Sequence, residues 1–147
     1  DNLKNNPSAR AIIFCRYNAE VFRIGEELDS ITNIVNVWGE TSNEELERIK
    51  ESFNSRNEEG IQIIVAQIKK LCFGINLQSA DYVIYFSNSW SYVERAQSED
   101  RAHRLGREGG VIYYDLICRD SIDLEVYEAL QDHKDFALRL SPETIGV

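Results

Sequence analysis

The stretch Ala11-Ile12-Ile13-Phe14-Cys15 decides the fold, because it is a short, unbroken apolar run between Arg10 and Arg16. A run of this kind predicts a strand buried on both faces, as is typical of parallel sheets. If strands and helices alternate around it, the chain forms an α/β domain.

The rest of the sequence supplies this alternation. Apolar runs predict four further strands, at Ile34–Val37, Ile61–Ala66, Tyr82–Phe86 and Val111–Leu116. Helical patterns lie between them, the connections are short, and the chain has no internal repeat. We therefore predict an α/β fold: a three-layer domain with a mostly parallel central sheet. Functional loops of such folds lie at the carboxyl ends of the strands, and three candidate segments are expected there: Arg16–Asn18, Ala66–Leu77 and Ser87–Trp90.

Each predicted helix has a recognisable start. Asn18 is the expected cap of the first helix, and Asp120 or Ser121 that of the last, which should end near Asp132. Ser-x-x-Glu capping boxes open two others, at Ser42 and Ser91. The expected inward side chains are Val21, Phe22, Ile24 and Leu28; Leu46, Ile49 and Phe53; and Ile122, Val126 and Leu130.

Composition limits the possible functions. The 147 residues are 43% hydrophobic and carry a net charge of −9, which argues against a dedicated nucleic-acid module, so any such contact needs a local basic edge or a partner domain. No apolar run approaches the ~20 residues that span a bilayer. The absence of methionine suggests a piece of a longer protein. Cysteines 15, 72 and 118 lack metal spacing, so each is expected to be a small buried residue in a reducing cytoplasm.

The segment from Ala96 to Arg107 carries the strongest functional signal. On a helix, Gln97, Arg101 and Arg104 share one face, and their guanidinium groups suit a polyphosphate. A solvated helix face, with Glu99 and Asp100 pairing locally, is the alternative. Helix geometry alone leaves both open.

The spacing Gln-x-x-Asp-Arg-x-His-Arg-x-Gly resembles the sixth motif of superfamily 2 helicases in its Swi/Snf-type form. The resemblance covers roughly residues 10–134, as the second RecA-like domain. Its other landmarks are Ala11–Tyr17, Val37–Ser42, Phe53-Asn54, Gly74–Leu77 with Ala80–Ile84, and Ser89-Trp90.

The resemblance implies roles for individual residues. Arg101 and Arg104 would act as arginine fingers, while Gln97, Gly74 and Asn76 would contact or orient the nucleotide; a turn or cap role is the alternative for Asn76. Candidate nucleic-acid contacts are Arg16, Tyr17, Lys69 and Lys70, although the two lysines could be an ordinary solvated pair. No metal ligand is expected: His103 should support its neighbours, His133 should be a surface residue, and Trp90 should lie in the core.

The chain has no Gly-x-x-x-x-Gly-Lys-Ser/Thr loop and no acidic pair after a strand to hold magnesium. ATP and Mg²⁺ would therefore be held mainly by an absent N-terminal RecA-like domain, and the isolated chain should be inactive. Residues 1–9 are the expected linker, 10–134 the helicase C-terminal domain and 135–147 a tail.

The leading hypothesis is the C-terminal motor domain of an ATP-dependent helicase or translocase. DNA, in preference to RNA, is the predicted partner, and no membrane partner is expected. Lys70-Leu71-Cys72 stands where Swi/Snf-type motors place a small residue and two glycines, and Arg107 where they often have Gln. These departures suggest a bacterial or viral lineage, and motivate one alternative, a degenerate domain that serves as a binding scaffold. The other is an unrelated α/β nucleotide-binding enzyme.

Overall fold

The computed structural model describes residues 3–71, 76–102 and 109–139, with side chains up to residue 134. The strands are β1 (Ala11–Cys15), β2 (Ile34–Val37), β3 (Ile63–Gln67), β4 (Tyr82–Tyr85) and β5 (Ile112–Asp115). The helices are α1 (Asn18–Asp29), α2 (Asn43–Asn54), α3 (Ile68–Leu71), α4 (Tyr92–Ala102) and α5 (Ile122–Arg139).

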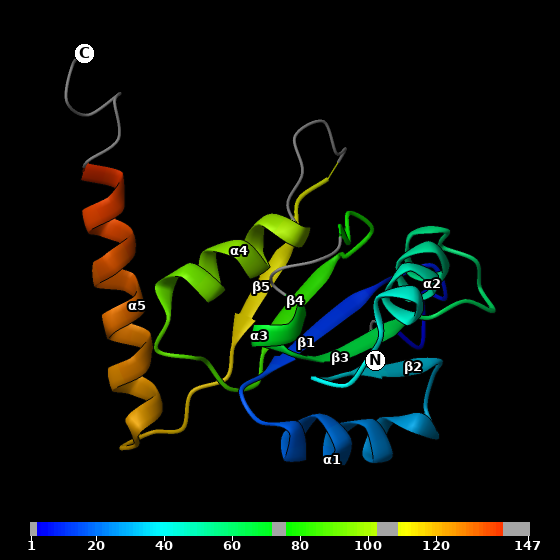
Figure 1. Cartoon of the computed structure of the whole chain (residues 1–147), viewed down its shortest axis with the longest axis horizontal. Coiled ribbons are helices and arrows are strands. Elements are labelled where there is room, and N and C mark those ends of the chain that lie inside the picture. Colours follow the sequence, from blue (N-terminus) through cyan, green and yellow to red (C-terminus); the bar gives the residue numbers. More distant parts are fainter. Residues whose placement is uncertain (1–2, 72–75, 103–108, 140–147) are drawn as a thin grey trace.

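The strands form one sheet in the order β2-β3-β1-β4-β5 (Figure 1), and all four pairings are parallel. Ala11, the first residue of the central strand β1, lies opposite Ile63 of β3 and Tyr82 of β4. The parallel α/β prediction is therefore confirmed, and β1 has the central position that its apolar run predicts.

Helices cover the sheet in two layers. On one face, Val21 of α1 packs on Ile13 and Val65. On the other face lie α2, α3 and α4 (Figure 1), which contribute Phe53, Leu71 and other side chains to the larger core. The α5 helix lies beside α4, at the β5 end of the sheet. Each predicted helix is present, so the three-layer prediction is confirmed.

Local details correct several predictions at the helix ends. Asn18 is the first residue of α1 rather than its cap; instead Glu20 Oε2 accepts a hydrogen bond from Tyr17 N at 3.1 Å. Ser121 caps α5 by accepting one from Asp123 N at 3.2 Å. The α5 helix continues past Asp132 to Arg139, and its first residue, Ile122, is 58% exposed rather than inward.

Three further side chains lie outside the core although we expected them inside it. Phe22 is 38% exposed and packs edge-on against Trp38, with ring centroids 5.1 Å apart. Trp90 is 45% exposed, because it lies in the loop between β4 and α4 rather than on a sheet-facing turn. Cys118 is exposed, Cys15 is buried as expected, and Cys72 lies outside the described residues.

Candidate functional site

The predicted site residues are divided between the two edges of the sheet. Arg16 and Tyr17 follow the carboxyl end of β1, and Lys69 and Lys70 lie on α3, directly after β3. Because all strands run in the same direction, these four residues lie at the carboxyl edge. Asn76 precedes β4, so it lies at the opposite, amino edge.

The turn at Arg16 and Tyr17 is fixed through its backbone. Arg16 N donates to Ser87 Oγ at 2.7 Å, and Tyr17 N donates to Glu20 Oε2 at 3.1 Å. Ser87 Oγ donates in turn to Glu20 Oε2 at 2.5 Å, which joins the loop after β4 to α1. Since the backbone donors are occupied, the Arg16 and Tyr17 side chains are the groups left to contact a ligand.

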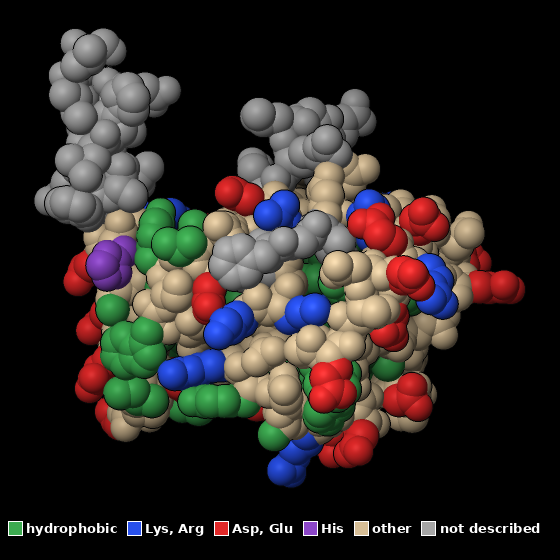
Figure 2. Space-filling model, in the orientation of Figure 1, with side chains coloured by type: hydrophobic (Ala, Val, Ile, Leu, Met, Phe, Trp, Pro, Cys, Tyr) green, Lys and Arg blue, Asp and Glu red, His purple; other side chains and the backbone are tan. Residues whose placement is uncertain are grey.

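Those side chains form a basic and aromatic pair. Tyr17 is 55% exposed, and the Arg16 guanidinium carbon lies 5.2 Å from the centroid of its ring. Nearby on α3, Lys69 is exposed, and Lys70 Nζ donates to Gly39 O at 3.4 Å. Figure 2 shows Lys and Arg side chains across the middle of the viewed face, whereas Asp and Glu gather toward its α2 side. The net charge of −9 therefore hides a local cationic region.

The second group of predicted residues meets at the amino edge. Leu77 N donates to Arg101 O at 3.0 Å, which joins the segment before β4 to the last turn of α4. Asn54 Nδ2 donates to Asn76 O at 2.9 Å, so the end of α2 holds the same segment. Gly74, His103 and Arg104 lie outside the described residues.

Gln97 lies one helical turn before Arg101 on α4. Its Oε1 atom is buried and accepts no hydrogen bond within the described part of the chain. Two residues four apart share a helix face. Gln97 and Arg101 therefore keep the common face that the sequence predicts.

The structure thus corrects one prediction about location. We expected the segment from Ala66 to Leu77 to lie wholly at the carboxyl edge, with the Arg16 turn and the loop from Ser87 to Trp90. Its start does lie there, but Asn76 and Leu77 lie at the amino edge, because the chain must return there before β4 begins parallel to β3.

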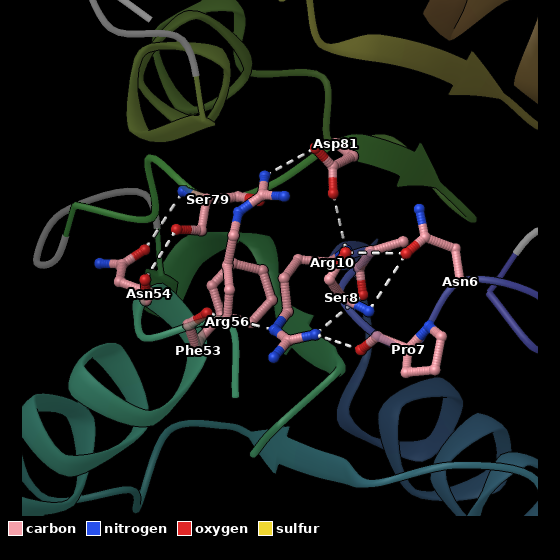
Figure 3. Close-up of polar contacts among 10 residues, drawn as sticks. Asn6, Pro7, Ser8, Arg10, Phe53, Asn54, Arg56, Ser79 and Asp81 are labelled. Atoms are coloured by element: carbon pink, nitrogen blue, oxygen red, sulfur yellow. Dashed lines mark hydrogen bonds and ion pairs between the residues drawn. The ribbon is translucent and has the colours of Figure 1, made fainter. Parts of the chain in front are cut away.

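Two arginines that sequence inspection missed, Arg10 and Arg56, hold the amino edge (Figure 3). Arg10 is fully buried, and its guanidinium donates to Phe53 O at 3.2 Å, Pro7 O at 2.9 Å and Asn57 O at 2.6 Å. Burial lowers its pKa, and the nearby Arg56 cation adds to this shift. Arg10 therefore binds the end of α2 to the start of β1.

Arg56 extends this network to the segment before β4. Its Nη2 donates to Ser79 O at 2.8 Å and pairs with Asp81 Oδ1 at 2.7 Å, while Asp81 Oδ2 accepts from Arg10 N at 2.9 Å. Ser79 also donates to Asn54 O at 3.1 Å (Figure 3). Hydrogen bonds from Arg56 and Asn54 thus tie the segment that carries Asn76 to the end of α2.

A third missed arginine anchors the start of α4. Arg95 pairs bidentately with Asp115, at 2.5 and 3.0 Å, and with Glu99 at 2.7 Å, and it donates to Asn88 Oδ1 at 2.8 Å. Burial opposes the charge on Asp115, yet the hydrogen bonds from Arg95 and Asn88 lower its pKa. No sequence signal marks this pair, because its members are 20 residues apart.

Among residues 3–71, 76–102 and 109–139, no group of three His, Cys, Asp or Glu side chains could hold a metal ion. Within the same ranges, no helix is long and apolar enough to cross a membrane.

The two edges of the sheet suit different ligand groups. The cationic turn at the carboxyl edge, formed by Arg16 and Tyr17, suits phosphate groups. The α4 face with Gln97 and Arg101 offers a guanidinium beside an amide.

Sequence comparison finds that residues 1–106 match the family described as "Helicase conserved C-terminal domain". Human "Lymphoid-specific helicase" is 33% identical over 96 residues, which are 65% of this chain and 11% of that protein. Human "SWI/SNF-related matrix-associated actin-dependent regulator of chromatin subfamily A member 1" is 34% identical over 90 residues, or 61% of this chain and 8% of that protein.

Structure comparison agrees with the sequence matches. The crystal structure described as the "C-terminal part of Fun30 ATPase domain" superposes with a TM-score of 0.76 and 26% identity, covering 88% of this chain and 42% of that one. The chain thus spans less than half of each of these proteins. The predicted cytoplasmic location and bacterial or viral origin stay predictions.

Proposed function

The chain belongs to the helicase conserved C-terminal domain family, in its Swi/Snf-type form, and on this premise we propose that it is the second motor domain of an ATP-dependent DNA helicase or translocase. ATP would bind between this domain and a preceding RecA-like domain, which would supply the phosphate loop and the magnesium ligands. This domain would contribute arginine fingers on one edge of its sheet and DNA contacts on the other.

One observation carries the proposal: the hydrogen bond from Leu77 N to Arg101 O. It brings together two segments, the one with Asn76 and the α4 helix with Gln97 and Arg101, that sequence inspection assigns separately to the nucleotide. The two segments are more than 20 positions apart in the chain, yet they meet at the amino edge of the sheet. A shared nucleotide site requires such a meeting.

The roles proposed for individual residues follow from their charge. Arg101 and Arg104 would stabilise the charge that develops on the transferred phosphoryl group, which is the action of an arginine finger. Gln97 would orient this pair, Gly74 would permit close approach of the backbone, and Asn76 would lie near the ribose.

At the carboxyl edge, Arg16, Tyr17, Lys69 and Lys70 would contact DNA phosphates. Such contacts hold a strand without reading its sequence, as a moving motor requires. The hydrogen bonding of the Arg16 turn supports this assignment, because it fixes the backbone that carries these side chains, so less conformational entropy is lost on binding. Membership of the family favours this motor over a degenerate binding scaffold.

The first test is Arg101→Ala in the protein that carries both RecA-like domains. DNA-stimulated ATP hydrolysis should fall by about 10³-fold, because an arginine finger is worth ~10³–10⁵ in rate. Arg48→Ala on the exposed face of α2 is the matched control and should retain wild-type rates. An Arg101→Ala protein with an unchanged kcat would refute the proposed role.

The second test separates this proposal from an unrelated nucleotide-binding enzyme. Residues 1–147 alone should show negligible ATP affinity and no hydrolysis, since the proposed phosphate and Mg²⁺ ligands belong to the other domain. Titration of the isolated chain with Mg-ATP, monitored by calorimetry, measures the ATP affinity directly. Tight binding by the isolated chain would favour the rival enzyme.

A further inference from the structure

The α4 helix is held on the sheet in an unusual way. Its buried residues are Arg95, Ser98 and Ala102, so no large apolar side chain of α4 is buried. By contrast, α2 buries Leu46, Ile49 and Phe53. Large apolar side chains normally determine where a helix lies on its sheet. For α4, polar contacts must therefore determine most of its position on the sheet.

Arg95 supplies those contacts. Its side chain is 10% exposed, and it pairs with Asp115 at the carboxyl end of β5 and with Glu99 on α4. Its guanidinium carbon also lies 3.5 Å from the centroid of the Tyr85 ring on β4. The planar Arg95 guanidinium is hydrogen-bonded along its edges and stacked on one face, so it has little freedom to rotate.

A second bond strengthens the same anchor. Tyr85 Oη and Ser98 Oγ lie 2.6 Å apart, one turn further along α4. Asn88 Nδ2 donates to Asp115 Oδ1 at 2.9 Å, which adds the loop before α4 to the network. The first two turns of α4 are thus joined to β4, β5 and the loop between β4 and α4 by hydrogen bonds that are wholly or partly buried and geometrically specific.

From these contacts we infer that Arg95 is a positioning residue: its pairing with Asp115 sets the position of α4, and so places Arg101 against the segment that carries Asn76. Arg95 and Arg101 are six residues apart, about 9 Å along a rigid helix. A slide or rotation at Arg95 would therefore move Arg101 by a similar amount and break the bond from Leu77 N to Arg101 O. The effect on catalysis rests on the proposed function, whereas the effect on this bond does not.

The direct test is amide hydrogen exchange of residues 1–147, read at Leu77. Asp115→Asn removes one charge of the pair and Arg95→Lys removes its bidentate geometry, each at similar side-chain size, so the Leu77 amide should exchange about 5–10-fold faster in both variants. The Ala11 amide, which donates to Gln62 O away from α4, should keep its wild-type rate. Lys50→Gln, which removes the partly exposed Lys50–Glu47 pair of α2, is the control and should leave exchange at Leu77 unchanged.

A double-mutant cycle shows whether the pair acts as a unit. Arg95→Gln combined with Asp115→Asn should accelerate Leu77 exchange no more than Arg95→Gln alone, because that single change already breaks the pair along with the other Arg95 contacts. Strictly additive effects, or wild-type exchange at Leu77 in both Asp115→Asn and Arg95→Lys, would overturn the inference. Thermal melts of each variant exclude global unfolding as the cause.

The rate of ATP hydrolysis by the protein with both RecA-like domains gives an independent test of the positioning role. Asp115→Asn should lower kcat for DNA-stimulated ATP hydrolysis about tenfold and leave the KM for ATP within about twofold, since a displaced arginine finger affects mainly the transition state. If Arg101→Ala lowers kcat while Asp115→Asn and Arg95→Lys do not, this inference is wrong and the proposed function stands. If Arg101→Ala has no effect, the proposed function fails, and Leu77 exchange still tests the positioning role.

Discussion

At the scale of single residues, three arginines that look alike in the sequence have different surroundings. Arg10 is fully buried among backbone carbonyls, Arg95 is buried between carboxylates, and Arg48 is exposed on α2. A buried cation is stable only if polar partners replace the water that it loses. Arg10 finds such partners in the carbonyl groups of four residues: Pro7, Ala9, Phe53 and Asn57.

Arg10→Lys tests this arrangement. A lysine ammonium cannot reach carbonyls in several directions at once, so some would remain buried without a donor. We expect the free energy of unfolding to fall by about 2–3 kcal/mol, measured by urea denaturation of residues 1–147. The matched exposed change, Arg48→Lys, should alter it by less than about 0.5 kcal/mol. Equal stability of the two variants would mean that the carbonyl contacts of Arg10 contribute little.

At the scale of elements, α2 and α4 begin in the same way but pack differently. Ser42 Oγ accepts from Glu45 N at 3.2 Å, and Ser91 Oγ accepts from Glu94 N at 3.3 Å, so both predicted N-caps are confirmed. Behind these caps, α2 buries three large apolar side chains, whereas α4 buries an arginine, a serine and an alanine. The cap is local in sequence, but the packing depends on which side chains the sheet presents.

Ser42→Ala should therefore destabilise the domain by about 1 kcal/mol, the usual effect of losing an N-cap acceptor. Ser42→Asp should restore stability, because a carboxylate accepts the same bond and favours the positive end of the helix dipole. Urea denaturation measures both, with Asn43→Ala as a neighbouring exposed control. A Ser42→Ala protein as stable as wild type would show that the packing of α2 alone holds this helix.

At the scale of the whole molecule, the sheet separates two groups of functional candidates. The cationic turn and α3 lie at the carboxyl edge, while Asn76 and the last turn of α4 lie at the amino edge. On the face that α1 covers, α1 contacts mainly β1, β2 and β3. Ile112 and Tyr114 of β5 remain 50% and 46% exposed, so the edge strand is less covered than the centre.

The cationic side chains at the carboxyl edge lead us to expect that DNA binding depends on salt concentration. In the protein with both RecA-like domains, Arg16→Ala combined with Lys70→Ala should weaken binding to a DNA duplex and make the slope of log K against log salt shallower by ~0.9 for each lost phosphate contact. Fluorescence anisotropy between 50 and 200 mM salt, about the range over which such contacts weaken, measures it. The control Lys50→Ala should keep the wild-type slope, and an unchanged slope in the double variant would remove this edge from the proposed DNA site.

The sequence alone determined the strand and helix order, the caps at Ser42 and Ser91, and the family, because apolar periodicity, capping residues and motif spacing are local properties of the chain. Chain order also allowed the parallel sheet to be predicted, since alternating strands and helices admit few other arrangements. The confirmed family and fold therefore required only short-range information.

Tertiary structure decided which of these residues meet. It placed Asn76 at the edge opposite Arg16, left Trp90 exposed, and buried Arg10 and Arg95. Contacts such as Arg95 with Asp115 and Leu77 with Arg101 join residues 20 or more positions apart. The physical reason is that the packing of the sheet, rather than local pattern, brings distant polar groups together, and a buried charge survives only where such partners arrive.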